Sequence, residues 1–214
     1  MSRSDHGASG IHNHAACASE HLVQLFDSKE SLAATVAAFL SAGCQAGDDL
    51  LVLAREENWI STHRVLAGSG LDIDALRASG RLTVMNAVVK ASESSRGGVP
   101  HRGAFETVIA GPVRALAGRA PLRIYGEMVD VLAELDDIDA AVTLEDMWNQ
   151  LAAEVPFRLL CGYSSARFVP RRAEVRLRDL CSRHTCVLSD HGDPLGGWLL
   201  RNSRLTFSSP ITGA

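Results

Sequence analysis

Short runs of consecutive apolar residues alternate along this chain with longer stretches in which apolar residues recur at helical spacing. Runs of the first kind are typical of buried strands, and stretches of the second kind are typical of helices that cover a sheet. Strands are predicted at residues 22–26, 50–54, 82–85, 122–125 and 157–161. Helices are predicted at residues 32–43, 58–67, 105–116, 138–152 and 173–181, and the Gly111-Pro112 pair should bend or break the third of them.

This alternation predicts an α/β fold, in which a mostly parallel central sheet carries helices on both faces as a three-layer sandwich. The length of 214 residues suits one such domain. Residues 1–20, rich in Ser, His, Ala and Gly, are expected to be a mobile tail. Residues 21–188 would form the domain, and residues 189–214 a polar C-terminal extension whose role the pattern leaves open.

Composition narrows the function classes. Hydrophobic residues make up 46% of the chain, but no apolar run is long enough for a membrane span. The net charge of -4 argues against a direct nucleic-acid-binding surface. The polar N-terminus lacks a signal-peptide core, so a cytoplasmic location is expected. Five unevenly spaced cysteines do not suggest a disulfide framework.

The strongest local signal is the strand at residues 122–125, which runs into Gly126 and then Glu127. Ligands of open α/β sheets bind outside the carboxyl ends of the strands, so Glu127 is a ligand-binding candidate. The alternative is a helix N-cap or a surface turn acid. Other strand ends supply further ligand-binding candidates, namely Phe26, Ser28, Lys29, Met128, Cys161 and Tyr163. Phe26 and Met128 could equally be core residues, and Lys29 an exposed first-turn residue.

Glu145 lies within an apolar helical stripe that includes Ala141 and Trp148, so it should be partly buried. A buried carboxylate needs a partner, and the candidates are Lys29, Arg123, Arg158 or a histidine. Either a structural ion pair or a ligand contact would satisfy the pattern.

Two histidines could orient or charge-balance these acids. His21 opens the first strand, and His184 follows Cys181 at a spacing that turns it inward if the last helix continues. His184 is either a core histidine or a ligand contact. Cys181, His184 and Cys186 have donor types that suit a metal, and Cys161 could join them. A second run with His12, His14 and Cys17 fits no known zinc spacing, and no resident cofactor is expected.

A set of short motifs, in order, resembles the MEDS domain, a sensory domain named for methanogens, methylotrophs and the regulator of dichloromethane use. The resemblance covers about residues 21–188. Its motifs are His21, Phe26-Asp-Ser-Lys-Glu-Ser-Leu32, Phe39-Leu40 with Gly43 and Gly47-Asp48, Leu50-Leu-Val-Leu-Ala54, Gly126-Glu127-Met128, Glu145 with Trp148-Asn149, Cys161-Gly-Tyr163 and Cys181-Ser-Arg-His184.

This resemblance implies a RecA-like fold related to circadian-clock-type ATPases. A phosphate-binding loop requires Gly-x-x-x-x-Gly-Lys-[Ser/Thr], because glycines let successive N–H groups wrap a phosphate. Residues 24–31 keep Lys29 but lack both glycines, and Asp27 and Glu30 add negative charge. The sequence therefore predicts the fold without the ATPase, and no other catalytic constellation is recognisable.

The function that the resemblance implies is a non-catalytic sensory domain of bacterial signal transduction or transcription control. It would bind a small molecule at the strand carboxyl ends and signal to a separate protein or within a homo-oligomer. Two alternatives remain: a degenerate RecA-like NTPase with residual nucleotide binding, and an interaction module of a sigma or anti-sigma pathway.

Because the loop glycines are missing, we expect the protein to bind ATP no more tightly than millimolar and to hydrolyse none above background. Isothermal titration calorimetry with ATP and Mg²⁺, beside a phosphate-release assay, measures both quantities. Micromolar binding that disappears in Lys29→Ala would contradict this expectation.

Overall fold

The structure, a computed structural model, describes residues 20–134, 137–168, 173–189 and 207–208. The predicted N-terminal tail up to residue 19, with its His12, His14 and Cys17 run, lies outside the described residues, as does most of the C-terminal extension. None of the helices in the described part of the chain combines the length and the apolar character of a membrane span.

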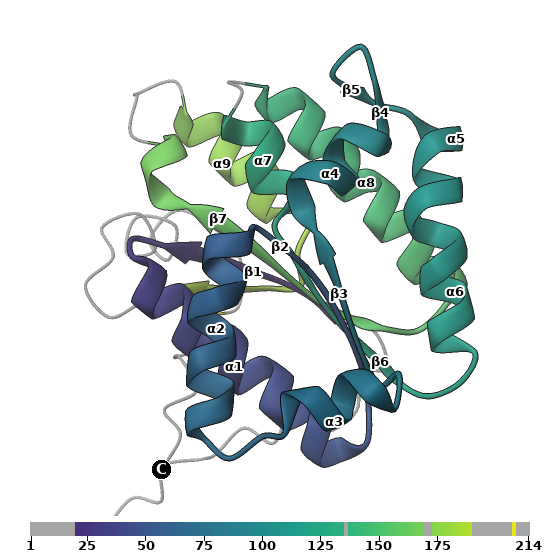
Figure 1. Ribbon diagram of the computed structural model, residues 1–214. Coiled ribbons are helices and arrows are strands. Elements are labelled where there is room, and N and C mark those ends of the chain that lie inside the picture. Colours follow the sequence, from purple (N-terminus) through teal and green to yellow (C-terminus); the bar gives the residue numbers. More distant parts are fainter. Residues whose placement is uncertain (1–19, 135–136, 169–172, 190–206, 209–214) are drawn as a thin grey trace, which may run out of the picture.

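Seven strands form the central sheet in the order β3-β2-β6-β7-β1-β8-β9, and every adjacent pair is parallel (Figure 1). The predicted parallel α/β sheet is therefore confirmed. β8 and β9 extend it beyond the five predicted strands, and both are too short to stand out as apolar runs. The strands are β1 (Glu20–Phe26), β2 (Asp49–Ala54), β3 (Leu82–Asn86), β6 (Leu122–Gly126), β7 (Arg158–Ser164), β8 (Cys186–Ser189) and β9 (Phe207–Ser208).

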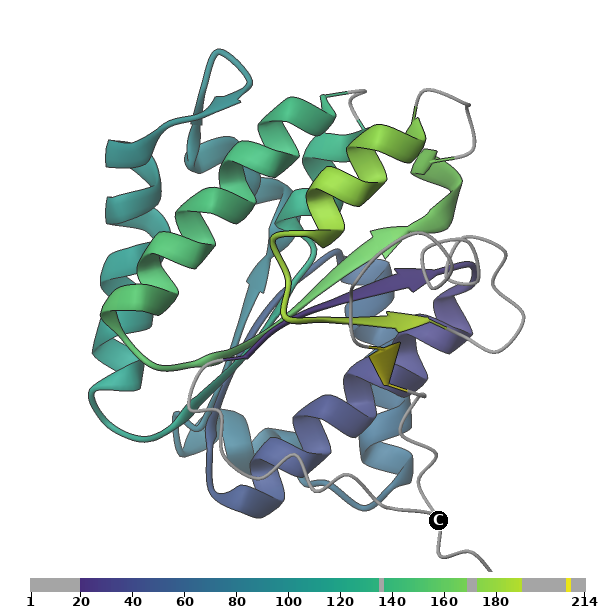
Figure 2. The same cartoon turned by 180° about the vertical axis from the view of Figure 1, so that it is seen from behind.

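Helices cover both faces of the sheet, as predicted (Figures 1 and 2). One face carries α1 (Lys29–Ala46), α2 (Glu56–Gly68) and α3 (Ile73–Ala78). The other carries α4 (Ala87–Glu93), α5 (Arg102–Phe105), the π-helical turn η1 (Glu106–Ala110), α6 (Gly111–Ala117), α7 (Met128–Glu134), α8 (Ile138–Glu154) and α9 (Ala173–Cys181). A 3₁₀ turn, η2 (Ser165–Phe168), follows β7, and a small hairpin of β4 (Ser95–Arg96) and β5 (Val99–Pro100) follows α4.

Alternating side chains of each strand serve the two apolar layers. In β7, Leu159, Cys161 and Tyr163 face the layer under α7, α8 and α9, whereas Leu160 packs beneath α1. β1 divides in the same way: Val23 belongs to the first layer and Phe26 to the second. Side chains of one strand can therefore reach two sites that the sheet separates.

The structure tests two glycine-based expectations. α1 does not end at Gly43 but continues to Ala46 and is closed by Gly47 in the left-handed conformation, with φ 85°. Gly43 therefore lies inside the helix. A side chain is excluded at this position because a Cβ would lie 2.5 Å from Cδ of the buried Arg123. Of the two outcomes expected at Gly111-Pro112, the break does not occur: the N–H of Gly111 reaches the carbonyl of Glu106, and this wider π turn carries the helix up to the pair.

Gly162 provides a test of the packing at the middle of the sheet. A Cβ at this position would lie 3.0 Å from Tyr125 Oη and 3.3 Å from Leu32 Cδ1. We expect Gly162→Ala to lower the free energy of unfolding by about 1–3 kcal/mol, because the added methyl group overpacks the layer. Urea denaturation measures the change.

The matched control is Gly68→Ala at the end of α2, where no atom lies within 4 Å of the added Cβ. We expect it to be neutral or stabilising by up to about 1 kcal/mol, since alanine is the better helix former. Equal effects of the two substitutions would show that the region around Gly162 relaxes without cost.

Candidate functional site

Glu145 is the most deeply buried charged side chain of the described residues, with 0% of its surface exposed. It lies on α8, whose first turn is capped by Asp137 accepting a hydrogen bond from the Ala140 N–H at 2.8 Å. The stripe formed by Ala141, Leu144 and Trp148 turns this face of α8 onto the sheet. The same packing that buries the stripe therefore carries a carboxylate into an apolar layer.

Four side chains from other segments converge on that carboxylate. Tyr163 Oη donates a hydrogen bond of 2.8 Å to Oε1, and His184 Nε2 lies 3.2 Å from the same oxygen. His21 Nε2 lies 3.2 Å from Oε2, and Cys161 Sγ lies 3.6 Å from it. His21 Nε2 and Cys161 Sγ are themselves 3.3 Å apart. We call Glu145, Tyr163, His184, His21 and Cys161 the Glu145 centre.

The outer nitrogens of both histidines are fixed by acceptors. Asn149 Nδ2 donates to the carbonyl of Arg183 at 3.0 Å, which turns its Oδ1 towards His21 Nδ1 at 2.9 Å. His184 Nδ1 lies 2.9 Å from the carbonyl of Leu180. Both Nδ1 atoms must carry a proton to make these bonds, so each neutral ring would direct its Nε2 lone pair into the centre.

The protonation states within the centre differ. Burial alone would lower the pKa of His21, but the attraction of Glu145 and hydrogen bonds to Glu145 and Asn149 outweigh it and raise that pKa. Burial lowers the pKa of His184, and nearby His21 adds to the effect, although the attraction of Glu145 opposes it. Although burial opposes ionisation, the histidines hold the pKa of Glu145 well below its usual range. Burial raises the pKa values of Cys161 and Tyr163 well above their usual range.

Glu127 belongs to a second cluster, at the carboxyl edge of the sheet and on the other face. Its Oε1 accepts a hydrogen bond of 2.8 Å from Tyr125 Oη, and its Oε2 accepts from Asn58 Nδ2 at 2.9 Å and from the N–H of Arg55 at 3.1 Å. Burial raises the pKa of Glu127 to about 7, although these three donors oppose the shift. Tyr125 packs with the layer under α1 and α2, so the structure does not bring Glu127 and Glu145 into one site.

Arg55 ties the end of β2 to α7 at this edge. Its guanidinium lies 3.1 Å from Asp130 Oδ2 and 2.8 Å from Glu134 Oε2. Asp130 Oδ1 in turn accepts the N–H of Ser164 at 2.9 Å, at the end of β7. These contacts join the ends of β2, β6 and β7 and give the edge a structural role.

The remaining sequence candidates lie apart from both clusters. Phe26 and Met128 are buried core residues on opposite faces of the sheet. Ser28 caps α1 by accepting the Ser31 N–H at 3.1 Å, and Lys29 is exposed in the first turn. Cys181 packs in the layer of the Glu145 centre, whereas Cys186 packs in the opposite layer, so Cys181, His184 and Cys186 do not form one metal set.

The connection between β1 and α1 consists of Asp27 and Ser28 alone. A phosphate-binding loop would occupy this position and needs several residues to encircle a phosphate. Asp27 is also exposed and accepts a hydrogen bond from Ser165 Oγ. The short connection and its acidic residue therefore leave no room for such a loop.

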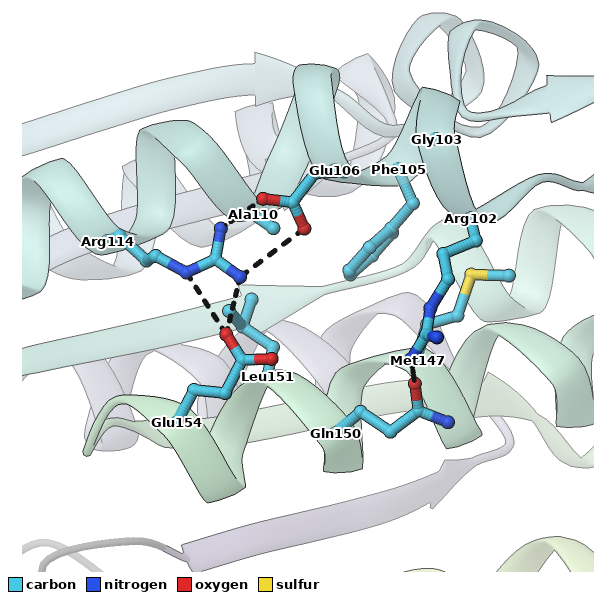
Figure 3. A pocket seen from close by; sticks show the side chains of 10 residues that line it. All are labelled: Arg102, Gly103, Phe105, Glu106, Ala110, Arg114, Met147, Gln150, Leu151 and Glu154. Carbon is cyan, nitrogen blue, oxygen red and sulfur yellow. Dashed lines mark hydrogen bonds and ion pairs between the residues drawn. The ribbon is translucent and has the colours of Figure 1, made fainter.

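A hollow of about 490 Å³ lies between α5, η1 and α6 on one side and α8 on the other (Figure 3). Phe105, Ala110, Met147 and Leu151 supply its apolar lining. At its rim Arg114 pairs with both Glu106 and Glu154, and Arg102 bonds Gln150, so these charges already have partners (Figure 3). None of the site residues predicted from the sequence lines this hollow.

Sequence reasoning missed several residues that complete the two clusters. They are Asn58 on α2 and Asp130 on α7, and Asn149 on α8, which the sequence analysis named only as part of a family motif. The position of Asp130 within the apolar run of residues 128–133 was the signal that could have identified it, whereas Asn58 shares its helical face with the polar Thr62 and gives no such signal.

The raised pKa of Glu127 makes stability depend on pH. A carboxyl group with a pKa of about 7 in the folded state and 4.5 in the unfolded state stabilises the fold fully below pH 4.5, and this contribution is lost as pH rises to 7. The loss amounts to roughly 3 kcal/mol. Glu127→Gln, which cannot ionise, should not show it.

We therefore expect the stability of wild type relative to Glu127→Gln to fall by roughly 2.5 kcal/mol between about pH 5 and about pH 8. Urea denaturation of both proteins at each pH measures this difference. The contributions of the other titrating groups are common to both proteins, so they cancel in the subtraction. A difference that stays constant with pH would mean that Glu127 ionises as it does in water.

The fold resembles that of a solved KaiC-like protein from the hyperthermophilic archaeon Pyrococcus horikoshii OT3. The superposition has a TM-score of 0.54 and 15% sequence identity, and it covers 82% of this chain and 75% of that one. The likeness supports the RecA-like three-layer architecture. A comparison with curated protein sequences finds no match.

The sequence model of the family described as MEDS, the methanogen/methylotroph, DcmR sensory domain, matches residues 20–185. This range begins one residue before His21 and ends one residue after His184, so it includes the whole Glu145 centre. The chain belongs to the MEDS sensory-domain family.

Proposed function

We propose that this chain is a non-catalytic sensory domain of bacterial signal transduction or transcription control, which binds a small ligand at the Glu145 centre. The observation that carries the proposal is the convergence of three other segments on one buried carboxylate of α8. β1 supplies His21, α8 supplies Glu145, β7 supplies Cys161 and Tyr163, and the turn after α9 supplies His184.

This arrangement couples the centre to the end of the domain. The turn between α9 and β8 is tied to β1 beside His21, because the N–H of Thr185 donates to the His21 carbonyl at 2.7 Å and Thr185 Oγ1 donates to it at 2.9 Å. Asn149 links the same turn to α8 through the carbonyl of Arg183. A ligand that prefers one arrangement of these contacts would change the position or the mobility of α9. A partner protein that binds α9 would then bind more or less tightly.

This proposal places the ligand away from the strand carboxyl ends that the sequence favoured. At that edge Glu127 already accepts three hydrogen bonds, and Arg55 is bound to two other acids. A ligand there would have to displace partners that are well placed. The Glu145 centre instead contains a nitrogen, His184 Nε2, without a hydrogen-bond partner among the described residues.

The alternative of a degenerate NTPase is disfavoured by the two-residue connection between β1 and α1. For the alternative of an interaction module, no contact in the described part of the chain speaks in its favour. The contacts of the centre with the turn after α9 make α9 the element whose position would change on ligand binding. A separate signalling protein, or a second copy of the chain, would bind there.

The test is a thermal-shift panel of nucleotides, divalent metals and small one-carbon or halogenated compounds, with amide hydrogen exchange of α9 measured for each hit. A ligand present at about 100 times its Kd should raise the midpoint by roughly 5–10 °C. It should also slow exchange in residues 173–181. In Glu145→Gln we expect the shift to disappear, because the charge at the middle of the centre is lost.

Glu154→Gln is the matched control, since Glu154 lies on the same helix but is exposed and pairs with Arg114. It should respond as wild type does. Equal shifts in wild type and Glu145→Gln would place the binding site elsewhere, and a hit that leaves α9 exchange unchanged would remove the proposed output.

A further inference from the structure

The Glu145 centre contains four donor atoms of the types that bind transition metals: two imidazole nitrogens, one carboxylate oxygen and one cysteine sulfur. These atoms, from His21, Glu145, Cys161 and His184, all lie within 4.8 Å of one another. We infer that the centre binds one divalent transition-metal ion of the zinc class through these four side chains. The inference rests on the proposed function and names the class of ligand that the same centre would sense.

The distances suit a tetrahedral ion. Bond lengths of about 2.0–2.3 Å to nitrogen, oxygen and sulfur place neighbouring ligand atoms about 3.3–3.7 Å apart. The observed separations are 3.2 Å from His21 Nε2 to Glu145 Oε2, 3.3 Å from His21 Nε2 to Cys161 Sγ, and 3.6 Å from Cys161 Sγ to Glu145 Oε2. Three edges of a coordination tetrahedron are thus nearly formed.

His184 supplies an independent observation. Its Nδ1 must donate to the carbonyl of Leu180, so the neutral ring presents a bare lone pair at Nε2. This atom is buried, lies 3.2 Å from Glu145 Oε1 and has no hydrogen-bond partner among the described residues. In the neutral ring, Nε2 and Glu145 Oε1 would face each other as two acceptors, and either a proton on Nε2 or a metal cation beside both atoms would satisfy them.

The charges also balance. The two positive charges of the ion would be matched by one thiolate, from Cys161, and one carboxylate, from Glu145, while both histidines bind as neutral rings. A site with no net charge can be held in an apolar layer at far lower cost than a charged one. Mixed nitrogen, sulfur and oxygen donors suit a borderline ion such as Zn²⁺ rather than Mg²⁺ or Ca²⁺.

The donors are oriented by hydrogen bonds to neighbouring groups, as metal ligands are in known sites. Metal-bound histidines usually donate their other N–H to a carbonyl or carboxylate, which fixes the tautomer and the ring. His21 is held in this way by the Asn149 side chain and His184 by the Leu180 carbonyl. Tyr163 holds the carboxylate of Glu145 from the outside. Asn149 is therefore a positioning residue for His21.

The same residues can be held together without a metal, by a proton shared between His21 and Glu145. A metal site and a proton network differ in the absorption spectrum that they give with Co²⁺. Co²⁺ in a tetrahedral site with a thiolate ligand gives strong visible d–d bands and a sulfur-to-metal charge-transfer band in the near ultraviolet, and a proton network gives neither.

The experiment uses the full chain, stripped with a chelator and kept reduced, and titrates it with Co²⁺ and then with Zn²⁺. We expect both Co²⁺ features to saturate at one equivalent and to be bleached by one equivalent of Zn²⁺. Cys161→Ser should lose the charge-transfer band, and Asn149→Ala should weaken Zn²⁺ binding by about 10–100-fold. Cys44→Ser, which alters a half-buried cysteine on α1, is the matched control and should behave as wild type.

Wild type that shows no saturable tetrahedral Co²⁺ spectrum would overturn the inference, even if every variant misfolds. A charge-transfer band that survives in Cys161→Ser would overturn it as well. Failure of the inference and failure of the proposed function are distinguishable. If an organic ligand acts through Glu145 and no metal binds, only the metal inference is ruled out and the proposed function stands. Metal binding with unchanged α9 exchange would support the metal site and remove the sensory output.

Discussion

The burial of the Glu145 carboxylate is the constraint on which the rest of this structure depends. A charge in an apolar layer is tolerated only when partners surround it, and α8 offers none of its own at the required distance. The partners come from β1, β7 and the turn after α9, which are far apart in the sequence. The carboxylate can therefore be buried only where β1 and β7 are neighbours and the turn after α9 packs against them.

The two polar clusters differ in how fully their side chains are paired. At the carboxyl edge, Arg55, Glu127 and Asp130 join strand ends to the helices that follow them, and all three side chains have several partners. Under α8 and α9, the donors of the Glu145 centre converge from several segments, and one nitrogen lacks a hydrogen-bond partner among the described residues. The RecA-like frame is thus retained, while the polar centre lies beneath the helices rather than at the edge where nucleotides bind in that fold class.

The sequence proposed all five members of this centre and expected its two histidines to balance the buried acids, but it also placed Glu127, Phe26 and Lys29 in the same site. The apolar neighbours of Glu145 predicted its burial, and the helical spacing after Cys181 predicted that His184 would turn inward. Strand alternation then places His21, Cys161 and Tyr163 on the same face of the sheet, but only once the pairing of β1 with β7 is known. The expected shared pocket of Glu127 and Glu145 did not form, because their clusters face opposite layers.

The sequence by itself determined the type and order of the main elements, since apolar periodicity depends on local geometry alone. It also determined the absence of a phosphate loop, since glycine content sets backbone freedom. Only the tertiary structure decided which side chains meet. A strand's neighbours are chosen by packing across the whole domain, and a shift of one residue in register would move every side chain to the other face. The donors of the Glu145 centre became neighbours through that long-range choice, which no local pattern encodes.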